Sequence, residues 1–291
     1  MALVTDPDSA VSQIPERACV GAGGSINAGH PMALVRALIR GRRSGMAVAG
    51  LTAGLDADML VAAGVCSRLV AAYAGAERYV SLPPAIRWAA EEDRLEIWES
   101  EEGVHLASLR ARAQRVPYAT WRGGVGTGVT RHPLVEQAVD DQTGAAYLKV
   151  RPLAVDVALL WAEAADEDGN VLIWGADMGD EALRAAADVR IVQVERLEPT
   201  EELARNPERL IPWAADVVVC APNGTHPFAG SSINLDSRWL VDYAATVDNA
   251  RRAGDPAAVD AFLDHWIRDV DGERGYFAQL GSGRLEPLVA R

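Results

Sequence analysis

Short apolar runs that alternate with amphipathic helical stretches constrain the fold of this 291-residue chain more than any other feature. In the first half, strand-like runs cover residues 18–23, 46–51, 68–74 and 95–99. After the first run, Pro31 occupies a position typical of the first residue of a helix, and four apolar residues follow at helical spacing: Leu34, Val35, Leu38 and Ile39. Further helices are expected at 56–63 and 103–115. This alternation predicts an α/β fold with an open, mostly parallel sheet covered by helices.

The second half repeats the alternation. A continuous apolar run at 155–162 predicts a central strand, and further strands are expected at 189–194 and 216–221, with a helix at 181–187. Glycine and proline cluster between residues 117 and 144, which predicts long loops there rather than a domain boundary.

The C-terminal part is predicted to be helical. Asp255 and Pro256 have the character of a helix cap and a first helical residue, and six apolar residues follow at helical spacing: Val259, Phe262, Leu263, Trp266, Ile267 and Val270. We therefore expect an α/β domain over residues 1–235 and a helical segment over 236–291. That segment is expected to pack on the domain or on a partner subunit.

Composition narrows the class of protein. The net charge of −13 disfavours binding to nucleic acid or to an anionic membrane surface. Three scattered cysteines without a CxxC pair are typical of buried, reduced thiols. The first 15 residues do not resemble a signal peptide, and no apolar run approaches the roughly 20 residues that span a bilayer. We expect a soluble cytoplasmic protein without a metal site, since the five histidines show no ligand spacing.

A glycine-rich turn at residues 21–24 lies between a predicted strand and a predicted helix. A dinucleotide-binding turn needs a third glycine where this chain has Ile26, and no acidic residue follows about 20 positions later. Two interpretations remain open. The turn offers backbone NH groups to an oxyanion or a thioester carbonyl, or it is a purely structural tight turn.

Two other segments carry candidate chemistry. A second glycine cluster, at residues 123–128, is either a substrate-side loop or simply mobile. The acidic run at residues 99–103 is either a solvated start of a helix or a reactive carboxylate at the carboxyl end of a strand.

Several segments, taken in order, resemble the α subunits of family I CoA-transferases of the glutaconate CoA-transferase type. They span about two hundred residues: GAGGSINAGHPMALVRAL at 21–38, AAGVCSRLVAAYAG at 62–75, EEGVHLASLRARAQRVPY at 101–118, AVDVALLWAEAADEDGN at 154–170, VRIVQVERLEPTEEL at 189–203 and IPWAADVVVCAPNGTHP at 211–227. Two departures stand out. Trp161 replaces a family histidine, and residues 71–75 lack a family serine.

The resemblance implies an acyl-CoA substrate and a homologous β subunit, in a heterodimer or heterotetramer, with the site in the cleft between the two chains. In the family, a glutamate of the β subunit forms the covalent intermediate. This chain would supply part of the substrate pocket, for which we single out Gly23, Gly24, Ser25, His30, Thr52, Gly54, Gly126, Thr127 and His226.

The resemblance also gives the acidic run a function. In α subunits resembling those of steroid ring-cleaving hydrolases, a glutamate of an "EG" motif is implicated, and Glu102 with Gly103 matches that motif. We therefore expect the α subunit of a heteromeric CoA-transferase-like enzyme. The alternatives are an acyl-CoA hydrolase, either ring-cleaving or thioester-cleaving, that uses Glu102, a relative with other acyl chemistry such as intramolecular condensation, and a non-catalytic ligand-binding subunit.

Overall fold

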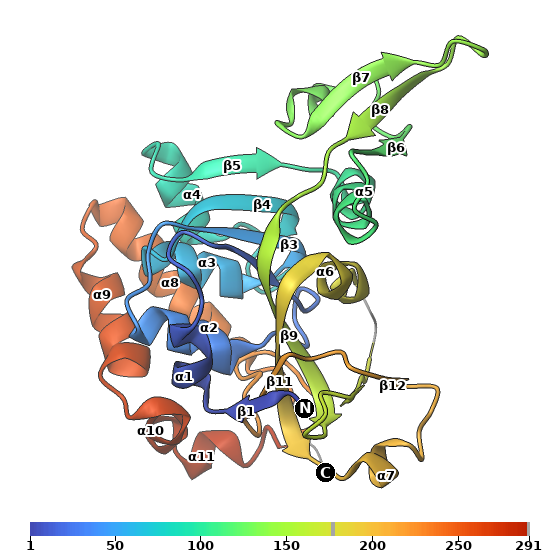
Figure 1. Cartoon of the computed structure of the whole chain (residues 1–291). Coiled ribbons are helices and arrows are strands. Elements are labelled where there is room, and N and C mark those ends of the chain that lie inside the picture. The colour runs from blue at the N-terminus through green and yellow to red at the C-terminus, as the bar shows by residue number, and fades with distance from the viewer. Residues whose placement is uncertain (176–177, 290–291) are drawn as a thin grey trace.

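A computed structural model describes residues 1–175 and 178–289, and within them ten strands form one main sheet (Figure 1). Eight strands lie side by side in the order β1-β13-β11-β9-β2-β3-β4-β5, and every neighbouring pair is parallel. Their bounds are β1 Leu3–Thr5, β13 Val217–Cys220, β11 Ala187–Leu197, β9 Val155–Ala165, β2 Cys19–Ala22, β3 Met46–Ala53, β4 Cys66–Ala74 and β5 Glu96–Glu99. The α/β fold with an open, mostly parallel sheet is therefore confirmed.

Helices cover both faces of this sheet. One face carries α1 (Pro7–Ser12), α2 (Met32–Arg40), α3 (Leu55–Ala62), α4 (Pro84–Glu91) and α8 (Ser237–Ala253). The other face carries α5 (Glu102–Ala113) and α6 (Asp180–Ala186), whose Leu109 and Leu183 pack with Leu160 of β9. Because both faces are covered, the central strands have apolar side chains on both sides, which explains their continuous apolar runs.

The connectivity of the sheet reverses between β2 and β9. From β2 the chain adds β3, β4 and β5 on one side, and from β9 it adds β11 and β13 on the other. The pairing of β2 with β9 ends at Ala22 and Leu159, whereas β9 continues beside β11 to Ala165. This is a topological switch point, where ligands of open α/β sheets bind outside the carboxyl ends of the strands.

The sequence predicted long loops at residues 117–144, but the structure has regular elements there. These residues contain β6 (Ala119–Trp121), the short helix η1 (Gly128–Arg131) and β7 (Val135–Val139), and the first and last of these pair with β8 (Ala146–Val150) in a separate antiparallel sheet. Leu148 and Val150 of β8 pack against Val104 and Ala107 of α5. Strands β6 and β7 have only three and five residues, so their apolar pattern was hidden among the surrounding turn residues.

The C-terminal residues form helices that pack on the main domain (Figure 1). After α8 come α9 (Ala257–Leu263), η2 (Asp264–Arg268), α10 (Gly272–Leu280) and α11 (Ser282–Leu285). Trp239 and Tyr243 of α8 share one hydrophobic core with α2 and α3. The boundary at residues 235 and 236 stays a prediction, since apolar contacts continue across it.

The remaining elements are short. They are β10 (Val171–Leu172), which pairs antiparallel with β9 and with β12 (Leu210–Ile211), and α7 (Thr200–Leu203). Three local expectations were wrong. Helices α2 and α9 begin at Met32 and Ala257, so Pro31 and Pro256 occupy the cap positions instead of the first helical positions. Cys220 is exposed instead of buried. Among the described residues, no helix has the length and apolarity needed to cross a membrane.

Candidate functional site

A cavity of about 260 Å³ lies at the topological switch point, beside the end of β2. One wall is the extension of β9 beyond its partner β2, namely Leu160, Trp161 and Ala162. The facing residues come from the glycine turn after β2, from α6 and from the segment before α8: Gly24, Ser25, Ala28, Gly29, Asp180, Glu181, Arg184, Ala229, Gly230 and Ser231. Five further apolar residues belong to other strands or follow them: Val171, Ile173, Trp174, Val192 and Ile211. Gly175 completes the lining. Two predicted site residues, Gly24 and Ser25, therefore line this cavity.

The glycine turn itself is tightly packed against α6. A Cβ atom at Gly23 would lie 2.8 Å from the side chain of Leu160 and 3.0 Å from Asp180 Oδ1. The Gly24 NH donates to the Asp180 carboxylate, at 3.1 Å from Oδ1. The NH groups of Gly23 and Ser25 donate to backbone carbonyls of Leu159 and Ala28. All three amides are thus engaged within the protein, so the turn as it stands is a structural one rather than an open oxyanion cradle.

Three other predicted residues lie behind the glycine turn and support it. Thr52 Oγ1 donates to the Gly24 carbonyl at 3.4 Å, and its own carbonyl accepts from Ile26 NH at 3.0 Å. A Cβ atom at Gly54 would lie 2.5 Å from the Ile26 carbonyl oxygen, so only glycine fits there. The His30 ring packs against Phe228, with 4.3 Å between the ring centroids and an angle of 39° between the ring planes.

His30 also forms a buried pair with Asp56, the second residue of α3. His30 Nδ1 and Asp56 Oδ2 are 3.2 Å apart, and both side chains are about 1% exposed. Burial favours the neutral acid, but the charge and hydrogen bonding of His30 outweigh it and lower the pKa of Asp56. The pair lies behind the glycine turn, and neither residue lines the cavity.

A buried carboxylate, Glu195 of β11, organises the Trp161 wall of the cavity. Glu195 Oε1 accepts from Trp161 Nε1 at 3.0 Å. Its Oε2 accepts from Asn223 NH at 2.6 Å and from Ser232 Oγ at 2.5 Å. One carboxylate therefore holds the indole and both ends of the segment 223–232, whose residues 229–231 line the cavity.

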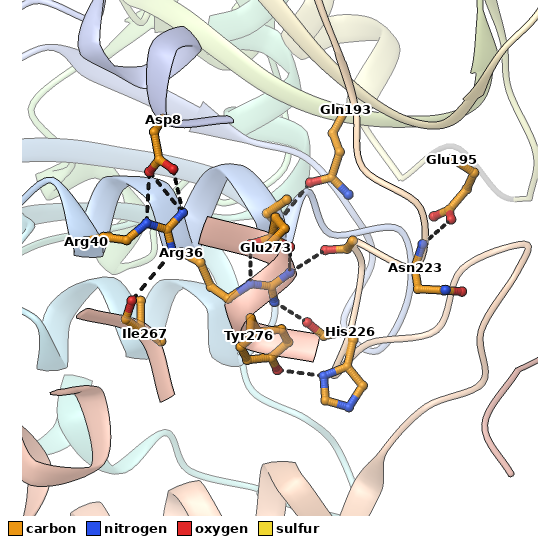
Figure 2. Close-up of polar contacts among 12 residues, drawn as sticks. Asp8, Arg36, Arg40, Gln193, Glu195, Asn223, His226, Ile267, Glu273 and Tyr276 are labelled. Carbon is orange, nitrogen blue, oxygen red and sulfur yellow. Dashed lines mark hydrogen bonds and ion pairs between the residues drawn. The ribbon is translucent and has the colours of Figure 1, made fainter. Parts of the chain in front are cut away.

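Arg36 of α2 fixes the same segment from the other side (Figure 2). Its guanidinium donates to the carbonyls of Gly224 (3.2 Å) and His226 (2.5 Å), and it pairs with Glu273 of α10. The guanidinium also lies 4.0 Å above the ring centroid of Tyr276. These contacts link the C-terminal helices to the cavity wall.

Glu102 is exposed at the start of α5, where β5 ends. The neighbouring Glu101 caps this helix, since its Oε2 accepts from Val104 NH and from Trp121 Nε1, each at 3.0 Å. Within the described residues, no hydrogen bond or ion pair engages the Glu102 side chain. One turn later, Leu106 reaches Gly179 at the start of α6. Glu102 therefore belongs to the same edge and face of the sheet as the cavity, outside its lining.

The remaining predicted residues lie elsewhere. Gly126 and Thr127 are exposed in the small antiparallel sheet region. His226 is fully buried, with Nδ1 2.6 Å from Tyr276 Oη and Nε2 3.2 Å from Asp236 Oδ2. Burial lowers its pKa despite the hydrogen bond to Asp236. Among the described residues, no cluster of three or more His, Cys, Asp or Glu could hold a metal ion.

Sequence reasoning missed several lining residues, among them Trp174, Asp180, Arg184 and Ser231. Trp161, which departs from the family pattern, forms a wall of the cavity. A usable signal for Asp180 was its position at the start of a predicted helix that follows the central strand. Glu195 had a weaker signal, an acid that directly follows the predicted apolar run at 189–194.

Comparisons with known proteins agree with this geometry. The sequence model of the family named Coenzyme A transferase matches residues 4–218. The "Cholesterol ring-cleaving hydrolase IpdA subunit" of Rhodococcus jostii is 32% identical over 253 residues, which are 81% of this chain and 84% of that protein. A glutaconate CoA-transferase subunit of Acidaminococcus fermentans is 26% identical over 91% of this chain and 88% of its own length.

The solved structure of glutaconate coenzyme A-transferase from Acidaminococcus fermentans has the same fold. It superposes with a TM-score of 0.92, covers 100% of this chain and 96% of its own, and is 24% identical. The family match covers well over half of the chain, including the strands on both sides of the switch point. This chain belongs to the Coenzyme A transferase family.

Proposed function

We propose that this chain is the α subunit of a heteromeric CoA-transferase-like enzyme that acts on an acyl-CoA thioester or a carboxylate. The observation that carries the proposal is the cavity at the switch point, which is built by the glycine turn that resembles the family. Relatives of this chain are named as subunits, which favours a site shared with a homologous β subunit. A cytoplasmic location is part of the proposal, because the three cysteines are unpaired and reduced thiols are usual there.

In the transferase reaction, a glutamate carboxylate of the partner attacks the thioester carbonyl and expels the CoA thiolate, which leaves a mixed anhydride. The thiolate then attacks the glutamyl carbonyl, which releases the first acid and forms an enzyme thioester. A second carboxylate reverses these steps and leaves as the new acyl-CoA. This chain contributes the wall that holds the acyl group.

Hydrolysis by Glu102 is the second candidate, and one observation favours it. Glu102 is an exposed carboxylate at the carboxyl end of β5, free of the capping bonds that occupy Glu101. The Rhodococcus relative is named a ring-cleaving hydrolase subunit. As a general base, Glu102 would take a proton from water while the water oxygen adds to the thioester carbonyl and the CoA thiolate leaves.

The test begins with co-purification of this chain and a homologous β subunit, which is sought in the neighbouring reading frames. The complex is then given an acyl-CoA with and without a carboxylate acceptor. Transfer of CoA only when the acceptor is present supports the transferase, and release of free CoA without it supports the hydrolase. An active, stable monomer of this chain would overturn the heteromer proposal.

The Glu102→Gln variant separates the two chemistries further. In the hydrolase, it is expected to lower kcat by about 10²–10⁴-fold, the usual contribution of a general base. Glu16→Gln is the matched control, since Glu16 is also exposed but precedes β2 at the opposite edge of the sheet. Full hydrolytic activity of Glu102→Gln would remove Glu102 from the chemistry.

A further inference from the structure

The cavity at the switch point has an uneven lining. Its apolar side chains come from the strands: Leu160, Trp161, Ala162, Val171, Ile173, Trp174, Val192 and Ile211. All three charged lining residues, Asp180, Glu181 and Arg184, belong to a single helix, α6. The charged set holds two acids and one base, so it does not favour a second anionic group.

We propose that this cavity binds the hydrocarbon part of an acyl-CoA thioester and that Trp161 limits the size of the acyl group. The inference rests on the proposed acyl-CoA function and names its substrate class, a nonpolar acyl group rather than a dicarboxylic one. An apolar wall gives no partner to a buried hydroxyl or carboxylate, and burial of an unpaired polar group is unfavourable.

Trp161 is held in place from two sides. Its indole NH donates to the buried Glu195, and Gly29 lies close against the ring, since a Cβ atom there would be 3.6 Å from Trp161 Cε3. Glu195 also fixes Asn223 and Ser232. A ring fixed in this way is a rigid wall, so it discriminates by size. Glu195 is a positioning residue in this scheme.

The volume of the cavity sets the expected acyl size. Because a water molecule takes about 30 Å³ in the liquid, a cavity of about 260 Å³ holds on the order of ten non-hydrogen atoms. Each methylene moved from water into such a site gains about fourfold in affinity. In the complex, kcat/KM is therefore expected to rise about fourfold per added carbon from acetyl-CoA upward and to level off when the cavity is full.

The test compares straight-chain acyl-CoA substrates from two to twelve carbons in the reconstituted complex of the wild type and of Trp161→Ala. The variant is expected to level off several carbons later than the wild type, because the cavity gains the space of the indole. Trp213→Ala is the matched control, because Trp213 is 74% exposed and does not line the cavity. Glutaryl-CoA is expected to be a poorer substrate than pentanoyl-CoA.

A second readout does not depend on turnover. Affinity for non-reactive S-alkyl-CoA thioethers of the same lengths is measured by calorimetry on the same complexes. If no acyl-CoA is turned over but affinity rises with chain length and Trp161→Ala changes that dependence, the cavity inference stands and the proposed function fails. If turnover is present but Trp161→Ala and Trp213→Ala keep the wild-type length dependence, the inference is overturned and the function stands. If Trp161→Ala does not fold, Trp161→His, with a smaller ring, takes its place under the same criteria.

Discussion

Asp58 is a fully buried carboxyl group where α3 meets α4 and α8, and it makes the stability of this chain depend on pH. Its Oδ1 accepts from Ile86 NH and its Oδ2 from Tyr243 Oη, each at 2.8 Å. Burial outweighs these hydrogen bonds and raises the pKa of Asp58 to about 7. The folded chain therefore keeps a proton on Asp58 at pH values where the unfolded chain has lost it.

The sign follows from proton binding. An unfolded aspartate has a pKa of about 3.9, so between about pH 4 and pH 7 the folded chain binds more protons and stability falls as pH rises. Above pH 7 both states are ionised and the loss is complete. Two units separate pH 5 from the folded-state pKa, and each unit is worth about 1.4 kcal/mol. We expect Asp58 to lower the free energy of unfolding by about 3 kcal/mol between pH 5 and pH 8.

The Asp58→Asn variant tests this value. Urea unfolding of both chains, followed by tryptophan fluorescence at pH 5 and pH 8, gives the difference in free energy of unfolding at each pH. Other titrating groups cancel in that difference, as does any fixed cost of the amide. The free energy of unfolding of the variant, relative to that of the wild type, is expected to rise by about 3 kcal/mol between pH 5 and pH 8.

Asp141→Asn is the matched control, because Asp141 is exposed at the turn between β7 and β8. It should leave the pH dependence as in the wild type. A difference between Asp58→Asn and the wild type that stays constant from pH 5 to pH 8 would refute the reasoning, because the buried carboxyl would then ionise as easily as an exposed one.

Three further predictions concern stability and reactivity. Arg36→Ala is expected to cost about 3–5 kcal/mol in urea unfolding, since it leaves Glu273 and two carbonyls without their buried partner. Gly54→Ala is expected to cost about 1–3 kcal/mol, because its new methyl group would overlap a backbone carbonyl. A thiol reagent is expected to modify Cys220 first and Cys66 only on unfolding, because burial raises the pKa of Cys66 to about 12.

Each of these has a control and a contrary outcome. Arg238→Ala removes an arginine that is 85% exposed, and an equal loss in both variants would show that the buried contacts of Arg36 contribute nothing. Gly283→Ala adds a methyl group in open space, so a matching loss there would point to a general glycine effect. Equal rates of modification for the two cysteines in the folded chain would contradict the thiol prediction.

The sheet could be predicted from the sequence because its central strands are apolar runs covered on both faces. The predicted runs at 18–23, 46–51 and 155–162 correspond to β2, β3 and β9. Strand β1 and the sheet of β6, β7 and β8 could not be predicted in this way. Each is short or half-exposed, and such strands carry little hydrophobic periodicity.

The candidate site was predicted only in part. The glycine turn could be placed near a ligand because glycines after a strand mark a close backbone approach. The hydrogen bond from its Gly24 amide to Asp180 could not be predicted, since the two residues are 156 positions apart. The hydrogen bond between Trp161 and Glu195 could not be predicted either. The two residues are 34 positions apart and meet because β9 and β11 are neighbours in the sheet.

The amino-acid sequence by itself determined the alternation of strands and helices, the glycine turn after the apolar run that begins at residue 18, and the resemblance to a family. These are local patterns of side-chain size and polarity, so neighbouring residues are enough to reveal them. The tertiary structure decided that β2 ends short of β9, that the space so left becomes an apolar cavity, and that one buried carboxylate holds its tryptophan wall. These features depend on strand order and register, which follow from the packing of the whole chain and not from any one segment.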